Sequence, residues 1–374
     1  MHYTFHLTNN CNMACTYCYV DKHNVVLMER ETAVKAVNLA ADEKKSVGII
    51  FFGGEPLMHK NLIYETVEYC KWMEKRHNCR FHYKVTTNGL LLDEAFMEFS
   101  LKYNIFIALS HDGIREAHDK HRVDNEGKGT FEKLTAKMEL LLSKRPYAPV
   151  LMVVSPDTVD FYAKSVQYLY QRGFGYLICS LNYAAAWTDR DMKKLEKQYK
   201  ELAAFYLEMT LAENKFYLSP FEVKISSHIN GKTYLKERCE LGKKQISVGP
   251  DGTLYPCVQF VGEKDSAIGH VDTGINEERR EALFRLNGAE KEDCSHCAIK
   301  NRCNHHCGCL NKQATGSIEK VSPVLCAHER ILVPIADKLA AKLYKKRNPM
   351  FIQKHYNDMY PLLSWIEDSK QNHF

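Results

Sequence analysis

The 374-residue sequence lacks the features that mark secreted and membrane-spanning proteins. Its first residues, MHYTFHLTNN, contain neither the basic segment nor the apolar core of a secretory signal. No apolar run approaches the roughly 20 residues that a helix needs to span a bilayer. We therefore predict a cytoplasmic protein with no membrane partner.

The sequence also lacks internal repeats, low-complexity linkers and any local excess of one charge. The net charge is only +5 and the basic residues are scattered, whereas nucleic-acid-binding domains gather them on one face. Hydrophobic residues make up 45% and charged residues 26%, both near the averages for globular proteins, so disorder and coiled coils are not expected. We predict a globular protein with no nucleic-acid partner.

Cysteine is abundant, with 14 residues that fall mostly into two groups. Disulfides are rare in a reducing compartment, so clustered cysteines there indicate metal or redox chemistry. Cys70, Cys79 and Cys179 lie outside both groups and are expected to be structural.

Short apolar runs alternate with longer amphipathic stretches through the first half of the chain, which is typical of βαβ units around a parallel sheet. Six strands are predicted, at residues 3–7, 47–52, 81–86, 105–110, 150–154 and 176–181. This is fewer than the eight strands of a closed barrel. The predicted fold class is therefore α/β, with a partial (β/α)6 TIM-type barrel.

The composition changes beyond a long helical pattern that ends near residue 213. Turns, glycines and most of the remaining cysteines follow, and such loop-rich segments bury too little apolar surface to fold without metals. We predict a barrel at 1–225, a small cysteine-rich iron–sulfur domain at 226–335 and a C-terminal helical segment at 336–374.

The first cysteine group, Cys11, Cys15 and Cys18, forms a CxxxCxxC motif directly after the first predicted strand. Three thiolates hold only three irons of a [4Fe–4S] cube, whereas ferredoxin-type cubes use four cysteines. The fourth iron would be open to chelate a methionine moiety. From spacing alone, a zinc site or buried core cysteines remain alternatives.

This motif, together with Gly53-Gly54-Glu55-Pro56 after the second strand, resembles the radical S-adenosylmethionine (SAM) superfamily. The resemblance implies a SAM-binding [4Fe–4S] cluster and a 5′-deoxyadenosyl radical. It also implies a set of SAM or cluster contacts, namely Tyr17, Gly53, Gly54, Glu55, Asn88, Ser110 and Arg122. Plainer roles stay open for some of them: a turn for Asn88-Gly89, a helix cap for Ser110, an ion pair for Arg122 and packing for Tyr17.

The second cysteine group is compatible with two structural zinc sites or with two further iron–sulfur clusters, because thiolates bind both. Its spacing is similar to the seven-cysteine SPASM domain of peptide-modifying radical SAM enzymes. That resemblance implies one auxiliary cluster on Cys294, Cys297, Cys303 and Cys326, and another on Cys239, Cys257 and Cys307. Cys309 either completes the latter cluster or leaves it open to a substrate thiolate. With the SAM-binding cluster, three [4Fe–4S] clusters are expected.

The same resemblance implies a polypeptide substrate. Sulfatase-maturing members usually carry an acidic residue after the second auxiliary cysteine, whereas Val258 follows Cys257 here and cannot accept a proton. The segment from Cys303 to Asn311 is similar to ranthipeptide (CXXX-repeat) maturases. We therefore favour thioether crosslinking of a cysteine-rich precursor peptide, with an external one-electron donor of the flavodoxin or ferredoxin type.

Other products remain alternatives to the thioether: carbon–carbon crosslinks, epimerisation and formylglycine. A non-enzymatic zinc scaffold is a more distant alternative. No catalytic acid or base is predicted. Because the first strand begins almost at Met1, we expect leader recognition through the barrel mouth, the small domain or a separate protein. The tail aromatics Tyr356, Tyr360 and Trp365 are expected to pack a terminal helix rather than line a peptide groove.

Overall fold

The computed structural model describes residues 1–22, 25–43, 46–231 and 239–364. Trp365 lies outside the described residues. The chain divides into two compact units, each assembled from separated segments. The first unit comprises residues 1–110, 121–140 and 239–289, and the second comprises 111–120, 141–238 and 290–374. These discontinuous units do not test the predicted division at residues 225 and 335, which stays a prediction.

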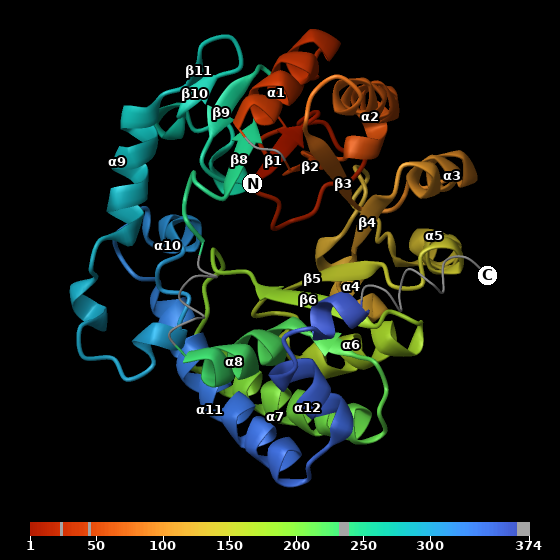
Figure 1. Ribbon diagram of the computed structural model, residues 1–374. Coiled ribbons are helices and arrows are strands. Elements are labelled where there is room, and N and C mark those ends of the chain that lie inside the picture. The colour runs from red at the N-terminus through yellow and green to blue at the C-terminus, as the bar shows by residue number, and fades with distance from the viewer. Residues whose placement is uncertain (23–24, 44–45, 232–238, 365–374) are drawn as a thin grey trace. The chain divides into compact units, whose positions relative to one another are not determined.

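Four parallel strands form the centre of the first unit, in the order β1-β2-β3-β4. Their bounds are β1 His2–His6, β2 Ser46–Phe52, β3 Arg80–Thr87 and β4 Ile105–Ser110. The helices α1 (Arg30–Glu43) and α2 (Lys60–Glu74) pack on each other and against β2 and β3, respectively (Figure 1). The helix α3 (Glu94–Lys102) begins where the Asp93 side chain accepts a hydrogen bond from the backbone N–H of Phe96.

Four short strands extend this sheet on the other side of β1. They are β8 (Gln245–Val248), β9 (Thr253–Tyr255), β10 (Gly269–His270) and β11 (Gly274–Ile275), and β8 pairs with β1 in parallel. The turn between β8 and β9 requires glycine at 252, where φ is +90°. Part of the predicted small domain therefore continues the sheet of the barrel, a pairing that sequence periodicity did not reveal.

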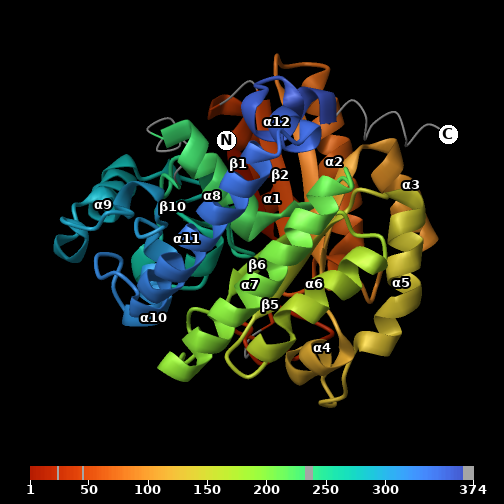
Figure 2. The same ribbon diagram turned by 90° about the horizontal axis from the view of Figure 1, so that it is seen from below.

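The second unit contains the parallel strands β5 (Pro149–Val154), β6 (Tyr176–Leu181) and β7 (Tyr217–Leu218). Two 23-residue helices, α7 (Asp189–Leu211) and α11 (Pro323–Lys345), lie side by side in this unit (Figure 2). A capping box of Thr188 and Asp191 begins α7, and Ser322 caps α11. The helices α8 (Ser219–Asn230) and α12 (Pro349–Tyr356) also pack against α11.

The remaining helices complete the architecture. They are α4 (Arg115–His121), α5 (Phe131–Lys144), α6 (Tyr162–Gln171), α9 (Glu277–Gly288) and α10 (Gly308–Thr315). All six predicted strands are present within one residue of their expected bounds, so the α/β fold of parallel strands alternating with helices is confirmed, as is the C-terminal helical segment. Among the described residues, none of the helices combines the length and apolar character needed to span a membrane.

Candidate functional site

The loop that carries Cys11, Cys15 and Cys18 begins directly after β1 and is held at several points by its own unit. The backbone N–H of Ala14 donates to the carbonyl of Val123 at 2.8 Å, and that of Thr16 donates to the carbonyl of His121 at 3.0 Å. Within the motif, the N–H of Cys18 donates to the carbonyl of Cys15 at 3.1 Å. The three thiols therefore sit on a loop whose backbone is already fixed.

The glycine pair after β2 closes onto the start of this loop. The N–H of Gly54 donates to the carbonyl of Thr8 at 2.8 Å, and the N–H of Glu55 donates to the carbonyl of Asn10 at 2.9 Å. A Cβ atom on Gly53 would lie 2.3 Å from the Thr8 carbonyl oxygen, and one on Gly54 would lie 2.1 Å from that of Asn10. Glycine is required at both positions because two backbones meet there.

The carboxylate of Glu55 is completely buried and ties the loop after β2 to the loop after β3. Its Oε1 accepts from the backbone N–H of Leu57 at 3.0 Å and the Thr87 hydroxyl at 2.7 Å, and its Oε2 accepts from the N–H of Asn88 at 2.7 Å. Burial raises the pKa of Glu55 to about 7, against the opposing effect of these hydrogen bonds. Glu55 is thus an organising residue of the site.

Asn88 links the loop after β3 to the cysteine loop. Its Nδ2 donates to the side-chain oxygen of Asn12 at 2.8 Å and lies 3.7 Å from the Cys11 sulfur. Gly89 has φ +85°, and a Cβ atom there would lie 2.5 Å from Leu109. Asn88-Gly89 therefore forms the expected turn, and this turn also places the Asn88 side chain next to Cys11.

Arg122 and Tyr17 lie together beside the cysteine loop. The Arg122 guanidinium is largely buried and lies 5.5 Å from the centre of the Tyr17 ring, which also packs 5.3 Å from the His121 ring. The Thr16 hydroxyl and His121 Nδ1 are 2.6 Å apart. Ser110 ends β4 in a half-buried position. The predicted cofactor residues thus all lie in the first unit, at the carboxyl ends of its strands or beside the cysteine loop.

Four cysteines of the second group lie close enough in the second unit for their charges to affect one another's pKa, namely Cys294, Cys297, Cys303 and Cys326. Burial raises the pKa of Cys294, and Cys297 and Cys326 raise it further. Burial likewise raises the pKa of Cys303 to about 12, with a smaller contribution from Cys294. These are the four residues expected to share one auxiliary cluster.

The other predicted auxiliary ligands are distributed between the two units. The sulfur atoms of Cys307 and Cys309 lie 3.3 Å apart in the second unit. In the first unit Cys239 is exposed and Cys257 is buried. Within the described parts of the chain, no three His, Cys, Asp or Glu side chains already form a metal-binding arrangement. Ligation by all eleven cysteines therefore stays a prediction.

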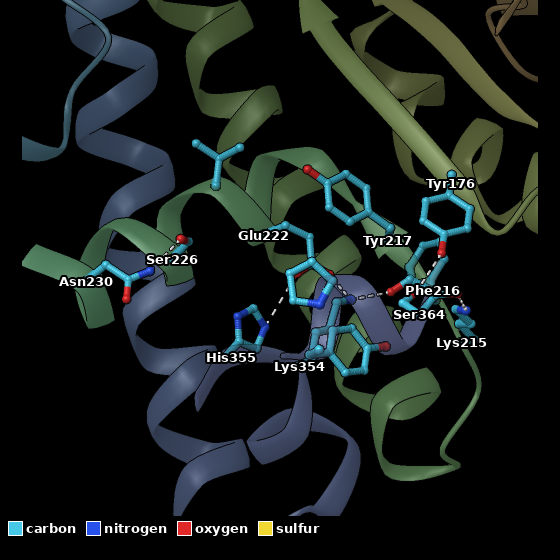
Figure 3. A pocket seen from close by; sticks show the side chains of 13 residues that line it. Tyr176, Lys215, Phe216, Tyr217, Glu222, Ser226, Asn230, Lys354, His355 and Ser364 are labelled. Atoms are coloured by element: carbon cyan, nitrogen blue, oxygen red, sulfur yellow. Dashed lines mark hydrogen bonds and ion pairs between the residues drawn. The ribbon is translucent and has the colours of Figure 1, made fainter. Parts of the chain in front are cut away.

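A cavity of about 640 Å³ opens in the second unit at the beginning of β6 (Figure 3). Glu222 is buried beside it, and its carboxylate accepts from the Tyr206 hydroxyl at 2.6 Å and pairs with Lys354. Its Oε2 also lies 3.4 Å from Nε2 of His355. Chemistry in parallel α/β folds gathers at the carboxyl ends of strands, whereas Tyr176 on the cavity wall begins its strand. We therefore do not place the reaction here.

A family model described as "Radical SAM superfamily" matches residues 5–174, from β1 to just beyond α6. These residues include the cysteine loop, the glycine pair and Asn88. Residues 5–174 form a radical SAM domain. The resemblance inferred from the motifs is confirmed for this segment.

Relatives of the chain extend beyond the radical SAM domain. A cysteine-type anaerobic sulfatase-maturating enzyme of Clostridium perfringens is 24% identical over 336 residues, covering 83% of this chain and 90% of the relative. The antilisterial bacteriocin subtilosin biosynthesis protein AlbA of Bacillus subtilis is 26% identical and covers 72% of this chain and 57% of that protein.

A solved structure shares the fold of the radical SAM domain and of most of the remaining chain. The structure of native anSMEcpe with bound AdoMet and the Cp18Cys peptide superposes with a TM-score of 0.78 at 21% identity, covering 92% of this chain and 99% of that one. At this identity the likeness establishes the fold alone.

Several residues that build the radical SAM domain's site were not predicted from sequence. Thr87, Asn10 and Asn12 hold the strand-end loops together, yet each reads locally as an ordinary turn or strand residue. His121 is a fourth, beside Tyr17. The sequence feature that could have identified these residues as part of the site is their position, since each lies within a few residues of a recognised motif.

Proposed function

We propose that the chain is a radical SAM enzyme that modifies a cysteine-containing polypeptide. One observation carries the proposal: the CxxxCxxC loop after β1, the glycine pair after β2 and Asn88 after β3 are joined by direct hydrogen bonds. The polypeptide substrate is supported by the named activities and biosynthetic roles of the relatives.

The residues of the first unit fit a SAM-binding cluster. Cys11, Cys15 and Cys18 supply three thiols on a fixed loop, and the loops around Gly54 and Asn88 pack directly against it. When bound, a [4Fe–4S] cluster held by these cysteines would supply the electron that cleaves SAM to a 5′-deoxyadenosyl radical. An external one-electron donor of the flavodoxin or ferredoxin type would provide that electron.

The protein's own residues would orient SAM. Arg122 offers a guanidinium fork, which is well shaped to pair with a carboxylate such as that of the methionyl group. Glu55 would act indirectly, because its carboxylate already accepts three hydrogen bonds from neighbouring loops. Gly53, Gly54, Asn88 and Ser110 would complete the SAM-contact set, with Tyr17 packing beside Arg122.

Two auxiliary clusters complete the proposal, within a small domain at 226–335 that follows a barrel at 1–225 and precedes a helical segment at 336–374. Cys294, Cys297, Cys303 and Cys326 would hold one cluster, supported by their electrostatic proximity. Cys239, Cys257 and Cys307 would hold the other. Cys309 is the candidate fourth ligand there, because its sulfur lies beside that of Cys307.

The first candidate reaction is oxidation of a substrate cysteine to formylglycine. It is favoured by the sulfatase-maturating relatives, which align with most of the chain. In this reaction the substrate loses its sulfur.

The second candidate reaction is thioether crosslinking, in which the cysteine sulfur is retained. It is favoured by one feature of the site loop: Val258 follows Cys257 in a short 3-10 turn and supplies no proton acceptor. The similarity of the segment around Cys307 to ranthipeptide maturases, inferred from sequence, points the same way.

Product analysis separates the two candidates. The anaerobically reconstituted enzyme would be incubated with SAM, dithionite and cysteine-containing peptides of both types, and the products examined by mass spectrometry and thiol alkylation. Formylglycine forms with loss of sulfur and gains an aldehyde that hydrazides capture. A thioether retains sulfur, loses two hydrogens and resists alkylation. Unchanged peptides of both types would refute the proposal.

A further inference from the structure

The backbone on both sides of Cys303, a predicted auxiliary-cluster ligand, is hydrogen-bonded to one ion pair within the second unit. Nζ of Lys224 on α8 donates to the carbonyl of Arg302 at 3.0 Å. Oε1 of Glu329 on α11 accepts from the N–H of Asn304 at 3.4 Å. The two charged groups therefore lie beside the segment that carries this cysteine, each held to one of its flanking residues.

This ion pair is almost completely buried. Nζ of Lys224 lies 2.8 Å from each carboxylate oxygen of Glu329, and the two side chains are 3% and 1% exposed. Moving two charges out of water costs free energy that their attraction often does not recover, and well-packed apolar residues of similar volume are often as stable or more so. Stability alone therefore gives no reason for charged residues at these two positions, which points to a use for the charge itself.

The charge of Glu329 acts on the Cys303 sulfur. Burial is the main reason that the pKa of Cys303 is raised to about 12, and Glu329 raises this pKa further. Lys224 lowers the pKa of the same thiol, but by less than Glu329 raises it. The two charges therefore do not cancel at the sulfur, and the carboxylate leaves a net negative influence there.

Other charged groups that influence the neighbouring cysteines are more open to solvent. Asp293 and Arg330 are exposed, and the Lys300 side chain is 28% exposed. Salt screens exposed charges much more strongly than buried ones. Among these groups, the charges of Glu329 and Lys224 are therefore the ones that act in the protein interior with little screening.

The cysteines near this ion pair fit a cluster whose electron uptake such a charge would affect. Cys303 and its three predicted partners supply the four thiols of a ferredoxin-type [4Fe–4S] cube, and Cys294 and Cys303 are only 8% and 7% exposed. The reduction potential of a bound cluster depends on nearby charge, hydrogen bonding and burial. A fixed carboxylate makes reduction less favourable, because the added electron is also negative.

We propose that the Glu329 carboxylate, held in place by Lys224, lowers the reduction potential of the auxiliary cluster that Cys303 would help to bind. Such a cluster takes up an electron less readily and gives one away more readily. The inference rests on the proposed function, since it concerns one of the clusters assigned to the enzyme there. It adds a residue that belongs to neither a cysteine motif nor the predicted SAM contacts.

The test is a redox titration of the cluster-loaded protein, followed by electron paramagnetic resonance. The signal of this cluster is identified as the one missing from Cys297→Ala. Glu329→Gln removes the negative charge and keeps an oxygen that can accept from Asn304, whereas Lys224→Met/Glu329→Leu removes both charges. In both variants the ratio of reduced to oxidised cluster at a fixed potential should rise about tenfold, which is about 59 mV for one electron.

Asp337→Asn is the matched control, because Asp337 also lies on α11 and pairs with Arg302, next to Cys303, at 2.6 Å. These side chains are 33% and 18% exposed, so the variant loosens the same segment but removes a screened charge. Its cluster should keep the wild-type potential.

Three results would overturn the inference and leave the proposed function standing: an unchanged potential in both Glu329 variants, a lower one, or an equal rise in Asp337→Asn. A wild type without any signal that depends on Cys297 would overturn the inference together with the assignment of this auxiliary cluster. Peptide modification and SAM cleavage test the rest of the proposed function separately.

Discussion

Glu55 shows how a single buried carboxylate can hold the loops of a site together. Its oxygens accept hydrogen bonds from Leu57, Thr87 and Asn88. In Glu55→Gln an amide N–H₂ would oppose at least one of these donors. We expect the free energy of unfolding to fall by about 1–2 kcal/mol and SAM binding to weaken because the Asn88 loop is released. Chemical denaturation and anaerobic equilibrium dialysis with SAM measure the two effects.

Glu74→Gln provides the control for this prediction. Glu74 also accepts a backbone hydrogen bond, from Phe81 at 2.8 Å, but it belongs to α2 and is not hydrogen-bonded to the cysteine loop. It should lose similar stability and keep its SAM affinity. Equal SAM binding by wild type and Glu55→Gln would contradict the organising role.

His355 makes the free energy of unfolding depend on pH. Burial lowers its pKa to about 4, against 6.5 for an ordinary histidine. As the pH falls below about 6.5 the unfolded chain takes up a proton that the folded protein refuses, so stability is lost between about pH 6.5 and 4. His355→Gln should therefore lose about 1–2 kcal/mol less than the wild type between pH 7 and 5. Anaerobic denaturation curves at both pH values measure this difference, and parallel losses in the two proteins would refute it.

At the scale of elements, the approach of the β2 loop to the cysteine loop depends on Gly54. In Gly54→Ala the new methyl group would meet the Asn10 carbonyl oxygen at 2.1 Å, and backbone must shift to relieve the contact. We expect reduced iron and sulfide content after reconstitution, measured by chemical analysis.

Gly48→Ala is the control for the glycine prediction, because Gly48 lies on β2, the strand that leads to Gly54, and the three atoms nearest to its added methyl group all belong to the His2 side chain. That side chain can turn away. Iron content should be normal in Gly48→Ala, and normal iron in Gly54→Ala as well would show that the close approach is unimportant.

The helices α8 and α11 are joined by a buried ion pair between Lys224 and Glu329, with side chains 3% and 1% exposed and the charged atoms 2.8 Å apart. Lys224→Met would leave the carboxylate buried and unpaired, at a cost of about 3–5 kcal/mol. The double variant Lys224→Met/Glu329→Leu should recover much of this loss. Thermal denaturation of both variants measures it.

A more exposed ion pair, between α7 and the 3-10 turn at Val159–Phe161, provides the comparison for this prediction. Lys194 pairs with Asp160 at 2.6 Å, with side chains 31% and 57% exposed. Lys194→Met should cost at most about 1 kcal/mol, because exposed ion pairs are weak. Similar losses in Lys224→Met and Lys194→Met would contradict the importance of burial.

The elements differ in how far sequence could predict them. The strands from Tyr3 to Leu181 are apolar runs between amphipathic helices, and their periodicity gave both type and position. By contrast β8 is only four residues long, and its pairing with β1 joins residues more than 240 apart. Such a contact is decided by tertiary packing, which a local pattern does not contain.

For the molecule as a whole, the spacing of the cysteine and glycine motifs predicted radical SAM chemistry, but it did not decide which modification of the peptide follows. The cysteines and glycines occur in fixed motifs, because a cluster and a close backbone contact each restrict residue type. These motifs do not distinguish one modification of a peptide from another, and thioether formation was favoured from sequence whereas the sulfatase-maturating relatives favour formylglycine.

The most direct test of the account is reductive cleavage of SAM by the reconstituted protein. The wild type and a Cys15→Ala variant would be incubated anaerobically with SAM, dithionite and a cysteine-containing peptide, and 5′-deoxyadenosine measured by chromatography. We predict 5′-deoxyadenosine and modified peptide from the wild type and neither from Cys15→Ala. A wild-type protein that binds iron and sulfide but forms no 5′-deoxyadenosine would contradict the central claim.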